Sequence, residues 1–221
     1  MKQTKIIFFG TTEFASGILQ TLIDEGYNVV AVVSQPDKPV GRKHTIQMTK
    51  AMDAGDIYAR VTTPLGKDET MAELNQRLLV LSKQLVKDNL EDYIAGKLVG
   101  EPQDDNKVIL GLNITKEEEK VQFAVEDVQT LYNHIRGLID WPMPYGVVDG
   151  KRMKFCKVRM RKEDHQVKPG EILGFKNHAM EVASIGGIIE VYELQPEGKS
   201  RMTADAYANG TGRNMIGKVF E

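Results

Sequence analysis

Two short segments of the sequence hold residue types that could take part in chemistry. Met52-Asp53-Ala54-Gly55-Asp56 places two carboxylates in a tight turn between two expected strands. Taken alone, the pattern is that of an Asx-type turn, since a metal-binding loop would need more oxygen ligands. Gly10-Thr11-Thr12 follows an apolar run and could begin a phosphate loop. It lacks the G-x-G-x-x-G pattern, so an ordinary strand-to-helix turn is favoured.

The other reactive side chains form no recognisable centre. The single cysteine, Cys156, rules out a disulfide framework and a cysteine-based zinc site, and it fits a reducing compartment. There is no G-x-S-x-G nucleophile motif. No histidine has metal-ligand spacing with another; the four are His44, His134, His165 and His178. We therefore expect no metal.

A run of cations between Lys151 and Lys168 makes part of the second half strongly basic. Eight Lys and Arg are opposed there only by Glu163 and Asp164, which gives a local net charge of +6. The whole chain has 29 Lys and Arg against 31 Asp and Glu, so any polyanion site must be local. Composition alone favours a solvated strand edge. The alternative is a nucleic-acid platform on a small barrel.

The first half alternates between strand and helix. Ile6–Phe9 and Val29–Val33 are apolar runs typical of buried parallel strands. Between them, Thr11 or Thr12 can cap a helix that Gly26 ends. Together these segments predict a right-handed βαβ unit.

After the second strand this alternation breaks. Residues 34–44 read as an exposed loop, and short strands are expected over 45–48 and 57–61 with no helix before them. The missing helix indicates an incomplete domain. Thr70-Met71-Ala72-Glu73 is a capping box that begins a long helix, which Gly96 ends.

In the second half the hydrophobic period changes from 3.6 to 2. A short helix from Val128 is expected to end at Gly137, and Asp149-Gly150 predicts a hairpin turn. The alternation slips near Cys156 or Lys157, where we expect a β-bulge. Further strands over 171–175, 179–184 and 188–194 suggest a small sandwich or barrel.

Composition also bounds the location of the protein. Hydrophobic residues make up 41% of the chain and charged residues 27%, as in ordinary soluble proteins. No apolar run approaches the ~18 residues of a membrane span. The few apolar residues before Gly10 are too short a run for a signal peptide. We expect a cytoplasmic protein with no membrane partner.

Several motifs, in order along nearly the whole chain, resemble methionyl-tRNA formyltransferases. Those of the first half are Phe8-Phe9-Gly10-Thr11, Glu13-Phe14-Ala15, residues 32–42 and residues 52–57. Those of the second half are Pro102-Gln103-Asp104, residues 113–118, Arg136-Gly137 with Trp141-Pro142, and residues 194–199 with Arg201-Met202. Leu-Gln-Pro-Glu-Gly-Lys together with Gln-Pro-Asp-Lys-Pro is specific to this family.

The resemblance implies an α/β fold in which a truncated Rossmann-like formyltransferase domain precedes a small OB-like β-barrel that binds tRNA. We expect the first domain over 1–100, a linker and helix over 101–140, and the barrel over 141–221. The implied reaction transfers a formyl group from 10-formyltetrahydrofolate to the amino group of methionyl initiator tRNA. Its tetrahedral oxyanion needs hydrogen-bond donors. A monomer is expected.

Residue roles also follow from the resemblance. In the family an Asn-x-His pair supplies the oxyanion donor and the acid, and the Asp of an Asp-x-Gly-Asp turn orients the His. Asp53 matches that Asp. The implied tRNA contacts lie in the loop directed to the acceptor stem and on the basic strand; they are Arg42, Lys43, Lys157, Arg159 and Arg161. No folate contact is assigned.

The chain also departs from the family. The Asn-x-His-x-Ser-Leu-Leu-Pro segment is absent, and neither Asn133-His134 nor Asn177-His178 has its spacing. In the family a block on the order of 90 residues, about three βα lengths, precedes the strand before Asp53. Here only a few residues near His44 stand in its place.

Two expectations follow from this deletion. Formyl transfer should be absent, and the faces of the first two strands should be exposed. One alternative is an inactive tRNA-binding remnant. Another is an unrelated nucleotide-binding α/β domain with a β tail, against which the ordered motifs argue.

Overall fold

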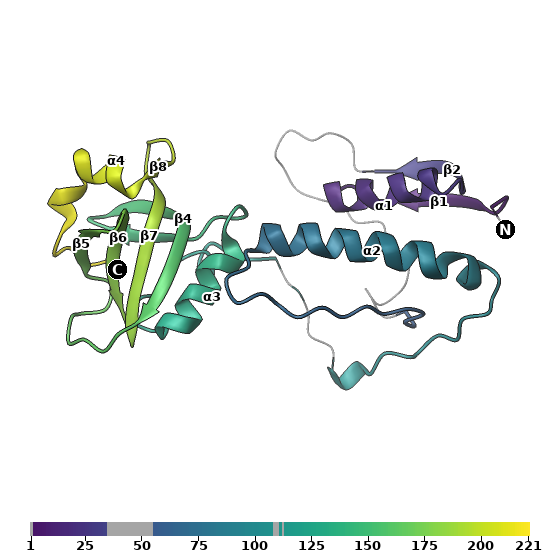
Figure 1. Ribbon diagram of the computed structural model, residues 1–221, viewed down its shortest axis with the longest axis horizontal. Helices are drawn as coiled ribbons and strands as arrows, with labels where there is room; N and C mark the ends of the chain where they lie inside the picture. Colours follow the sequence, from purple (N-terminus) through teal and green to yellow (C-terminus); the bar gives the residue numbers. More distant parts are fainter. Residues whose placement is uncertain (1, 35–54, 108–110, 112) are drawn as a thin grey trace. The chain divides into compact units, whose positions relative to one another are not determined.

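The computed structural model describes residues 2–34, 55–107, 111 and 113–221 (Figure 1). The chain forms two compact units. Unit 1 comprises Met1–Pro64 and Asn75–Leu110, and unit 2 comprises Leu65–Leu74 and Gly111–Glu221. Among the helices of the described residues, none is both long enough and apolar enough to cross a membrane.

Unit 1 contains the predicted βαβ unit. Strands β1 (Lys5–Phe9) and β2 (Asn28–Val33) pair in parallel, and helix α1 (Glu13–Asp24) connects them. The Thr12 hydroxyl caps α1 by accepting a hydrogen bond from the Ala15 amide at 3.2 Å. Gly26 follows the helix with a φ of 75°, a left-handed conformation that glycine adopts without strain. The capping predictions are therefore confirmed.

The sheet of unit 1 leaves apolar side chains in contact with solvent. Within the described residues it has only these two strands. Ile7 is 56% exposed and Val32 51%, and Phe9 and Val30 are exposed to a similar extent. Parallel strands in complete α/β domains are covered on both faces. The expected exposure of both strands is thus confirmed.

Helix α2 (Met71–Ile94) begins at the predicted capping box. The Thr70 amide donates to Glu73 Oε2 at 2.8 Å, and the Glu73 amide donates to Thr70 Oγ1 at 3.4 Å. The expected strand over 57–61 is wrong, because only Ile57 forms a bridge, with Glu101. A strand needs a partner along its length. The expected strand over 45–48 lies outside the described residues.

Unit 2 is built on an antiparallel sheet of six strands. Their order is β3-β4-β7-β6-β5, with β8 paired to β7. The strands are β3 (Tyr145–Val148), β4 (Lys151–Lys162), β5 (Ile172–Lys176), β6 (Ala179–Ser184), β7 (Gly187–Pro196) and β8 (Met202–Thr203). Among the described residues no ladder joins β3 to β5, so a mixed α/β protein is observed but a closed barrel is not.

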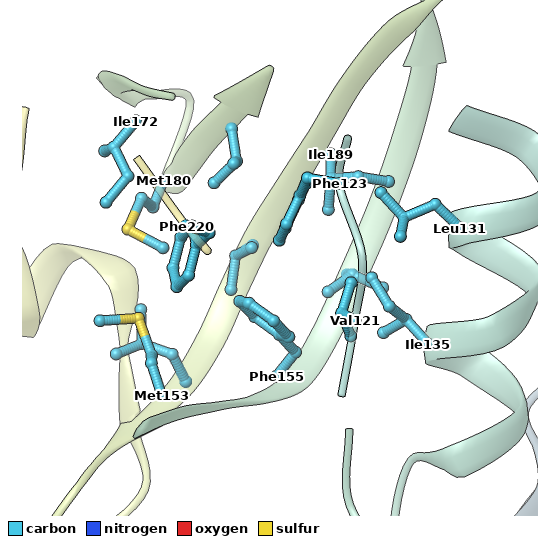
Figure 2. Close-up of a cluster of buried hydrophobic side chains, with 14 of the residues drawn as sticks. Val121, Phe123, Leu131, Ile135, Met153, Phe155, Ile172, Met180, Ile189 and Phe220 are labelled. Atoms are coloured by element: carbon cyan, nitrogen blue, oxygen red, sulfur yellow. The ribbon is translucent and has the colours of Figure 1, made fainter. Parts of the chain in front are cut away.

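The core of unit 2 lies between this sheet and helix α3 (Val128–Leu138) (Figure 2). Leu131 and Ile135 of α3 and Phe155 of β4 are fully buried in this core. Phe123 stacks on Phe220 with ring centroids 5.2 Å apart. Three short helices complete the described chain: η1 (Asp105–Lys107), α4 (Ala204–Asn209) and η2 (Gly212–Met215).

Residues 113–140 belong to unit 2, where Val121, Phe123 and the apolar face of α3 fill the core. The expected domain boundaries near 100 and 141 stay predictions. The expected end of the short helix differs from the structure. Helix α3 continues through Gly137 to Leu138, and Ile139 is its C-cap. Burial of Leu138 and Ile139 outweighs the helix-breaking tendency of a single glycine.

Candidate nucleic-acid interface

The outer face of β4 carries the basic residues that the sequence singles out. Phe155 pairs with Leu194, Lys157 with Glu193 and Val158 with Val191, so the pairing passes over Cys156 on β4 and Tyr192 on β7. Each strand therefore holds one extra residue, and the predicted bulge is confirmed. Because the bulge shifts the alternation by one residue, cations before and after it lie on the same, outer face; they are Arg152, Lys154, Lys157, Arg159 and Arg161.

Lys157 and Arg159 are the available cations at the centre of this face. Both side chains are exposed, while Val158 between them is buried in the core. Within the described residues neither forms an ion pair. Arg159 lies near Tyr132 and Tyr192, since its charge lowers the pKa of both phenols against the larger effect of burial. These two cations can therefore meet an external anion.

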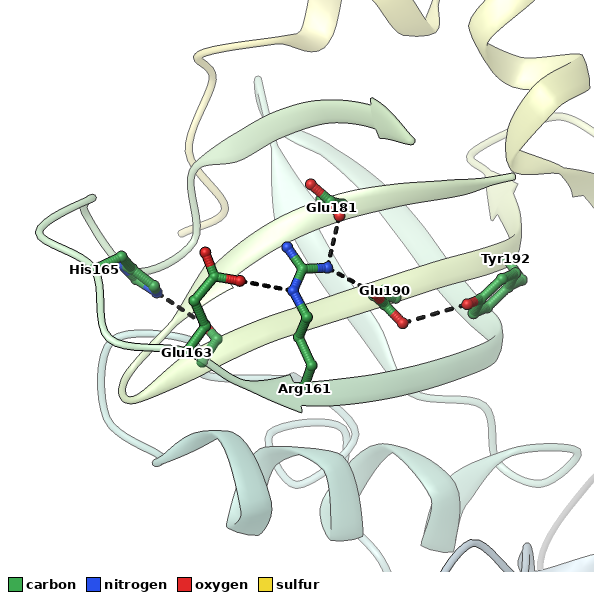
Figure 3. A network of polar contacts seen from close by, with 7 residues as sticks. Arg161, Glu163, His165, Glu181, Glu190 and Tyr192 are labelled. Atoms are coloured by element: carbon green, nitrogen blue, oxygen red, sulfur yellow. Dashed lines mark hydrogen bonds and ion pairs between the residues drawn. The ribbon is translucent and has the colours of Figure 1, made fainter. Parts of the chain in front are cut away.

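Arg161 differs, because three carboxylates surround it (Figure 3). Its Nε donates to Glu163 at 2.7 Å, and its Nη1 donates to both Glu181 and Glu190 at 2.6 Å. With one cation and three carboxylates the cluster has a net charge of −2. Arg161 thus ties together β4, β6 and β7, and it is not available to a phosphate without loss of these bonds.

The ionisation of this cluster follows from its hydrogen bonds. The hydrogen bonds that Arg161 donates to Glu181 and Glu163 raise the pKa of Arg161, so its guanidinium stays charged. In return, Arg161 lowers the pKa of Glu163. Glu181 is almost fully buried, with 9% of the residue exposed. A buried carboxylate of this kind depends on a partner, which here is Arg161.

Helix α3 makes polar contacts at its N-terminus and near its middle. Its N-cap, Asp127, accepts hydrogen bonds from the amides of Gln129 at 2.9 Å and Thr130 at 3.2 Å. Farther along, the Tyr132 hydroxyl donates to Asp68 at 2.9 Å. Burial raises the pKa of Tyr132 to about 12, so the phenol remains a donor. These contacts hold α3 in place next to Arg159.

The described histidines are all engaged in local structure. His134 Nδ1 lies 3.0 Å from Glu126 Oε1, and its Nε2 lies 2.7 Å from the Glu118 carbonyl. His165 contacts the Gly187 carbonyl, and His178 contacts Asp205. None of the three occurs with two further His, Cys, Asp or Glu residues in a group that could hold a metal within the described residues.

The described residues include only the end of the predicted catalytic turn and none of its neighbouring loop. Asp53, Arg42, Lys43 and His44 lie outside the described residues. The end of the turn is described: Gln103 Nε2 donates to the Gly55 carbonyl at 2.7 Å. The structure therefore brings the end of the Asp-x-Gly-Asp turn against the Pro102-Gln103-Asp104 motif.

A small cavity of ≈ 310 Å³ lies beside this junction. It is lined by Ile57, Arg60, Glu101, Pro102, Gln103, Asp104 and Lys107. Its volume is at the lower limit of roughly 300–1,000 Å³ for small-molecule sites, and four of its seven lining residues are charged. The cavity therefore does not offer the apolar wall that a large ring system needs.

The Arg161 cluster could not have been predicted from the sequence. Its acceptors come from a turn and from two strands that follow β4 in the chain, and only the strand register brings them together. The alternation of Lys157, Arg159 and Arg161 correctly predicted their shared face. It contained no signal that one of the three would be neutralised.

Comparison with known proteins gives a consistent set of relatives. Residues 113–212 match the family described as formyl transferase, C-terminal domain. The chain is 26% identical over 310 positions to the methionyl-tRNA formyltransferase of Streptococcus sanguinis, covering 98% of this chain and 99% of the relative. The enzyme of the same name from Lysinibacillus sphaericus is also 26% identical, over 99% of this chain and 100% of the relative.

The aligned lengths show that the Streptococcus sanguinis enzyme has residues that this chain lacks. The alignment spans 310 positions, which exceeds the 221 residues of this chain by 89. Because the alignment covers nearly all of both proteins, these additional residues lie within the aligned region and not beyond its ends. Their number is similar to the block of about 90 residues expected from the family pattern.

Solved structures share the fold. HypX from Aquifex aeolicus matches with a TM-score of 0.68 at 14% identity, covering 96% of this chain and 49% of HypX, so this chain spans about half of that protein. An N-formyltransferase from Helicobacter canadensis matches with a TM-score of 0.51 at 18% identity, covering 67% of this chain and 53% of that protein. Its structure holds folinic acid and dTDP-3-aminofucose.

Proposed function

Since the chain belongs to the methionyl-tRNA formyltransferase family, we propose that it binds tRNA through unit 2 and does not itself transfer a formyl group. The partner is methionyl initiator tRNA, and the fold of unit 2 is an OB-like barrel. Location in the cytoplasm and a monomeric state belong to the same proposal.

The proposal of tRNA binding rests on two cations, Lys157 and Arg159. Both are exposed on one strand face and neither is neutralised within the described residues. Lysine and arginine contacts to phosphates supply affinity that does not depend on sequence and that falls steeply with salt. Unit 2 also contains the whole match to the C-terminal family domain. Arg161 is assigned to holding the sheet together.

Loss of catalysis follows from what the chain lacks. The family reaction needs an acid and oxyanion donors, and the Asn-x-His segment that would supply them is absent from the sequence. Asp53 would have no histidine of that segment to orient. In the described part of the chain, His134, His165 and His178 are each held by other groups. A catalytic group that has lost its partners retains little activity.

The formyl donor implied by the family is 10-formyltetrahydrofolate, a folate-type donor. The residues described in unit 1 fit it poorly, because the cavity at Arg60 is small and charged. The absent block is also where the family carries its folate-contacting segment. We therefore infer that the donor is not bound productively by this chain.

The test combines two measurements on the full chain. A filter or gel assay with labelled methionyl-tRNA measures binding, and formylation of the same tRNA measures activity. We expect weak, salt-sensitive binding and no formylation above background. Lys157→Ala with Arg159→Ala should weaken binding and lower the salt slope by about 1.8, at roughly 0.9 per contact. If this double variant binds tRNA as tightly as the parent and with the same salt slope, the proposal is overturned.

A matched control keeps the charge change and moves it. Lys168→Ala with Lys199→Ala removes the same two charges from turns of unit 2, where both lysines are exposed. This control should bind nearly as the parent does. A second pair, Arg42→Ala with Lys43→Ala, tests the acceptor-stem contact that the resemblance implies. Formylation that depends on Asp53 would contradict the inactive state.

A further inference from the structure

Trp141 is the most exposed aromatic residue of unit 2 and the only tryptophan in the chain. It is 70% exposed, although large aromatic side chains usually gain stability by burial. The residues on both sides are firmly placed: Leu138 and Ile139 are buried before it, and Pro144 and Tyr145 are buried after it. Trp141 is therefore exposed within a well-packed segment and not at a loose chain end.

The backbone around Trp141 is also constrained. Asp140 and Met143 have φ values of 75° and 87°, in a region that side-chain-bearing residues seldom adopt. The Met143 amide donates to the Leu138 carbonyl at 3.0 Å, which closes the turn. Such conformations persist where the surrounding structure enforces them, and they occur often at ligand contacts. The turn holds the indole in solvent.

This turn lies beside the basic face of β4. The Phe155 amide donates to the Pro144 carbonyl at 2.9 Å, which places the turn next to the bulge. Tyr145, four residues after Trp141, pairs with Lys154 of β4, so the chain that follows the turn runs along the basic strand. Arg201 binds Glu193, the cross-strand partner of Lys157. The turn that carries Trp141 therefore adjoins the part of β4 that holds Lys154 and Lys157.

An exposed aromatic ring beside cations fits one kind of ligand well. Proteins that bind single-stranded nucleic acid combine a cationic path for phosphates with aromatic rings on which bases stack. An unpaired base offers a free ring face, whereas the bases inside a duplex remain stacked on one another.

We propose that Trp141 stacks on an unpaired base of the RNA whose phosphates contact Lys157 and Arg159. This inference rests on the proposed tRNA binding and adds to it a preference for single-stranded over paired nucleotides. The phosphate contacts supply affinity for any RNA, and the indole supplies the additional affinity for unpaired segments. It assigns Trp141 as a binding residue, not a catalytic one.

The single tryptophan makes the test direct. The intrinsic fluorescence of the full chain is followed during titration with a short unstructured RNA, and in parallel with the same sequence as a duplex. Binding itself is measured separately by anisotropy of labelled RNA, which does not depend on Trp141. We expect the single strand to quench the fluorescence, with the same midpoint as the anisotropy, and the duplex to bind with little quenching.

Variants separate stacking from charge. Trp141→Leu should weaken single-strand binding about tenfold with an unchanged salt slope, since a stacked base contributes on that order. Trp141→Phe keeps a ring and should recover part of the loss. Lys157→Ala with Arg159→Ala should lower the salt slope for both RNAs. Circular dichroism of each variant verifies folding. The fluorescence titration uses the parent chain alone, so it tests the stacking role even if a variant does not fold.

The outcomes distinguish the two proposals. Anisotropy that shows no RNA binding by the parent overturns tRNA binding and the stacking role together. RNA binding without quenching, or full affinity in Trp141→Leu, overturns the stacking role alone. Fluorescence that changes with protein concentration in the absence of RNA also overturns it, in favour of contact with a second copy of the chain.

Discussion

Lys157 lies directly opposite Glu193 in the antiparallel pairing of β4 and β7, yet Glu193 forms its ion pair with Arg201. The Glu193 carboxylate accepts a hydrogen bond from Arg201 Nε at 2.7 Å. Opposite charges that face each other across a sheet normally attract. Because Arg201 occupies the carboxylate, Lys157 stays available to an external anion. By occupying this carboxylate, Arg201 keeps a second cation, Lys157, available.

Removal of Arg201 should therefore weaken RNA binding. In Arg201→Gln, Glu193 is released and can attract Lys157, which leaves fewer cations for phosphates. We expect a loss of affinity of about fivefold and a salt slope lower by about 0.9, as for one lost phosphate contact. Anisotropy titrations of labelled tRNA at two salt concentrations measure both quantities.

The double variant Arg201→Gln with Glu193→Gln identifies the cause of that loss. If the freed Glu193 captures Lys157, the neutral Gln restores binding to near the parent level. If the double variant binds as weakly as Arg201→Gln, then Arg201 contacts the RNA itself and the capture argument is wrong.

Replacement of Arg161 should destabilise unit 2 and affect RNA binding only as a consequence. Arg161→Met leaves Glu181 and Glu190 close together without their cation. Breaking a fully buried ion pair costs about 3–5 kcal/mol; the Arg161 side chain is 35% exposed, so we expect about 1–3 kcal/mol. Urea unfolding of unit 2 measures the change. Adding Glu181→Gln and Glu190→Gln should recover part of it, and no recovery would argue against charge as the cause.

The helix cap at Asp127 gives a pH-dependent contribution to stability. The hydrogen bond from the Thr130 side chain, followed by that from its amide, lowers the pKa of Asp127 below its ordinary value of 3.8. A lowered pKa in the folded state stabilises the protein above pH 3.8, and this contribution is lost as the pH falls through the folded value. Asp127→Ala should therefore lower the unfolding midpoint at pH 7 by a few degrees.

Comparison of thermal unfolding at pH 7 and pH 3 tests this account. The difference between the parent and Asp127→Ala should shrink at pH 3, where the carboxylate is partly protonated. Asp127→Asn provides the control, because the amide oxygen still accepts the cap hydrogen bonds but does not titrate in this range. A difference that stays constant with pH in Asp127→Ala would mean that the charge of the cap contributes nothing.

Unit 1 should be cleaved by proteases before unit 2. Its sheet has two strands within the described residues, and Ile7, Phe9, Val30 and Val32 are exposed. Regions with few buried apolar contacts open at low free energy, and proteases cut such regions first. Limited proteolysis followed by mass spectrometry should show a persistent fragment that contains residues 113–221. Survival of β1, α1 and β2 after loss of the unit 2 sheet would contradict this order.

Local signals in the sequence predicted local structure well. The cap at Thr12, the capping box at Thr70 and the hairpin turn at Asp149 depend on a few neighbouring residues, and all are present. The bulge near Cys156 was predictable because the slip in alternation lies within a single strand. In each case the determining interaction acts over a short stretch of chain.

Features that depend on distant segments were not predictable in this way. The alternation over 57–61 satisfied the strand pattern, but within the described part of the chain residues 58–61 pair with no strand. Glu181 and Glu190 reach Arg161 only through the order of β4, β7 and β6 in the sheet. The same limit applies to Glu193 and Arg201, whose pairing decides which cation remains available.

The extra residues on β4 and β7 also decide which changes of length the pairing of these two strands can tolerate. Deletion of Cys156 alone would keep Phe155 and Val158 in the core and Lys157 in solvent, because these three residues would then alternate regularly. Deletion of Tyr192 alone would likewise keep Leu194 and Val191 in the core, with Glu193 between them. Loss of both residues together would leave Phe155 opposite Leu194 and Lys157 opposite Glu193 in a regular ladder. Either extra residue can therefore be lost without turning the cations of β4 toward the core.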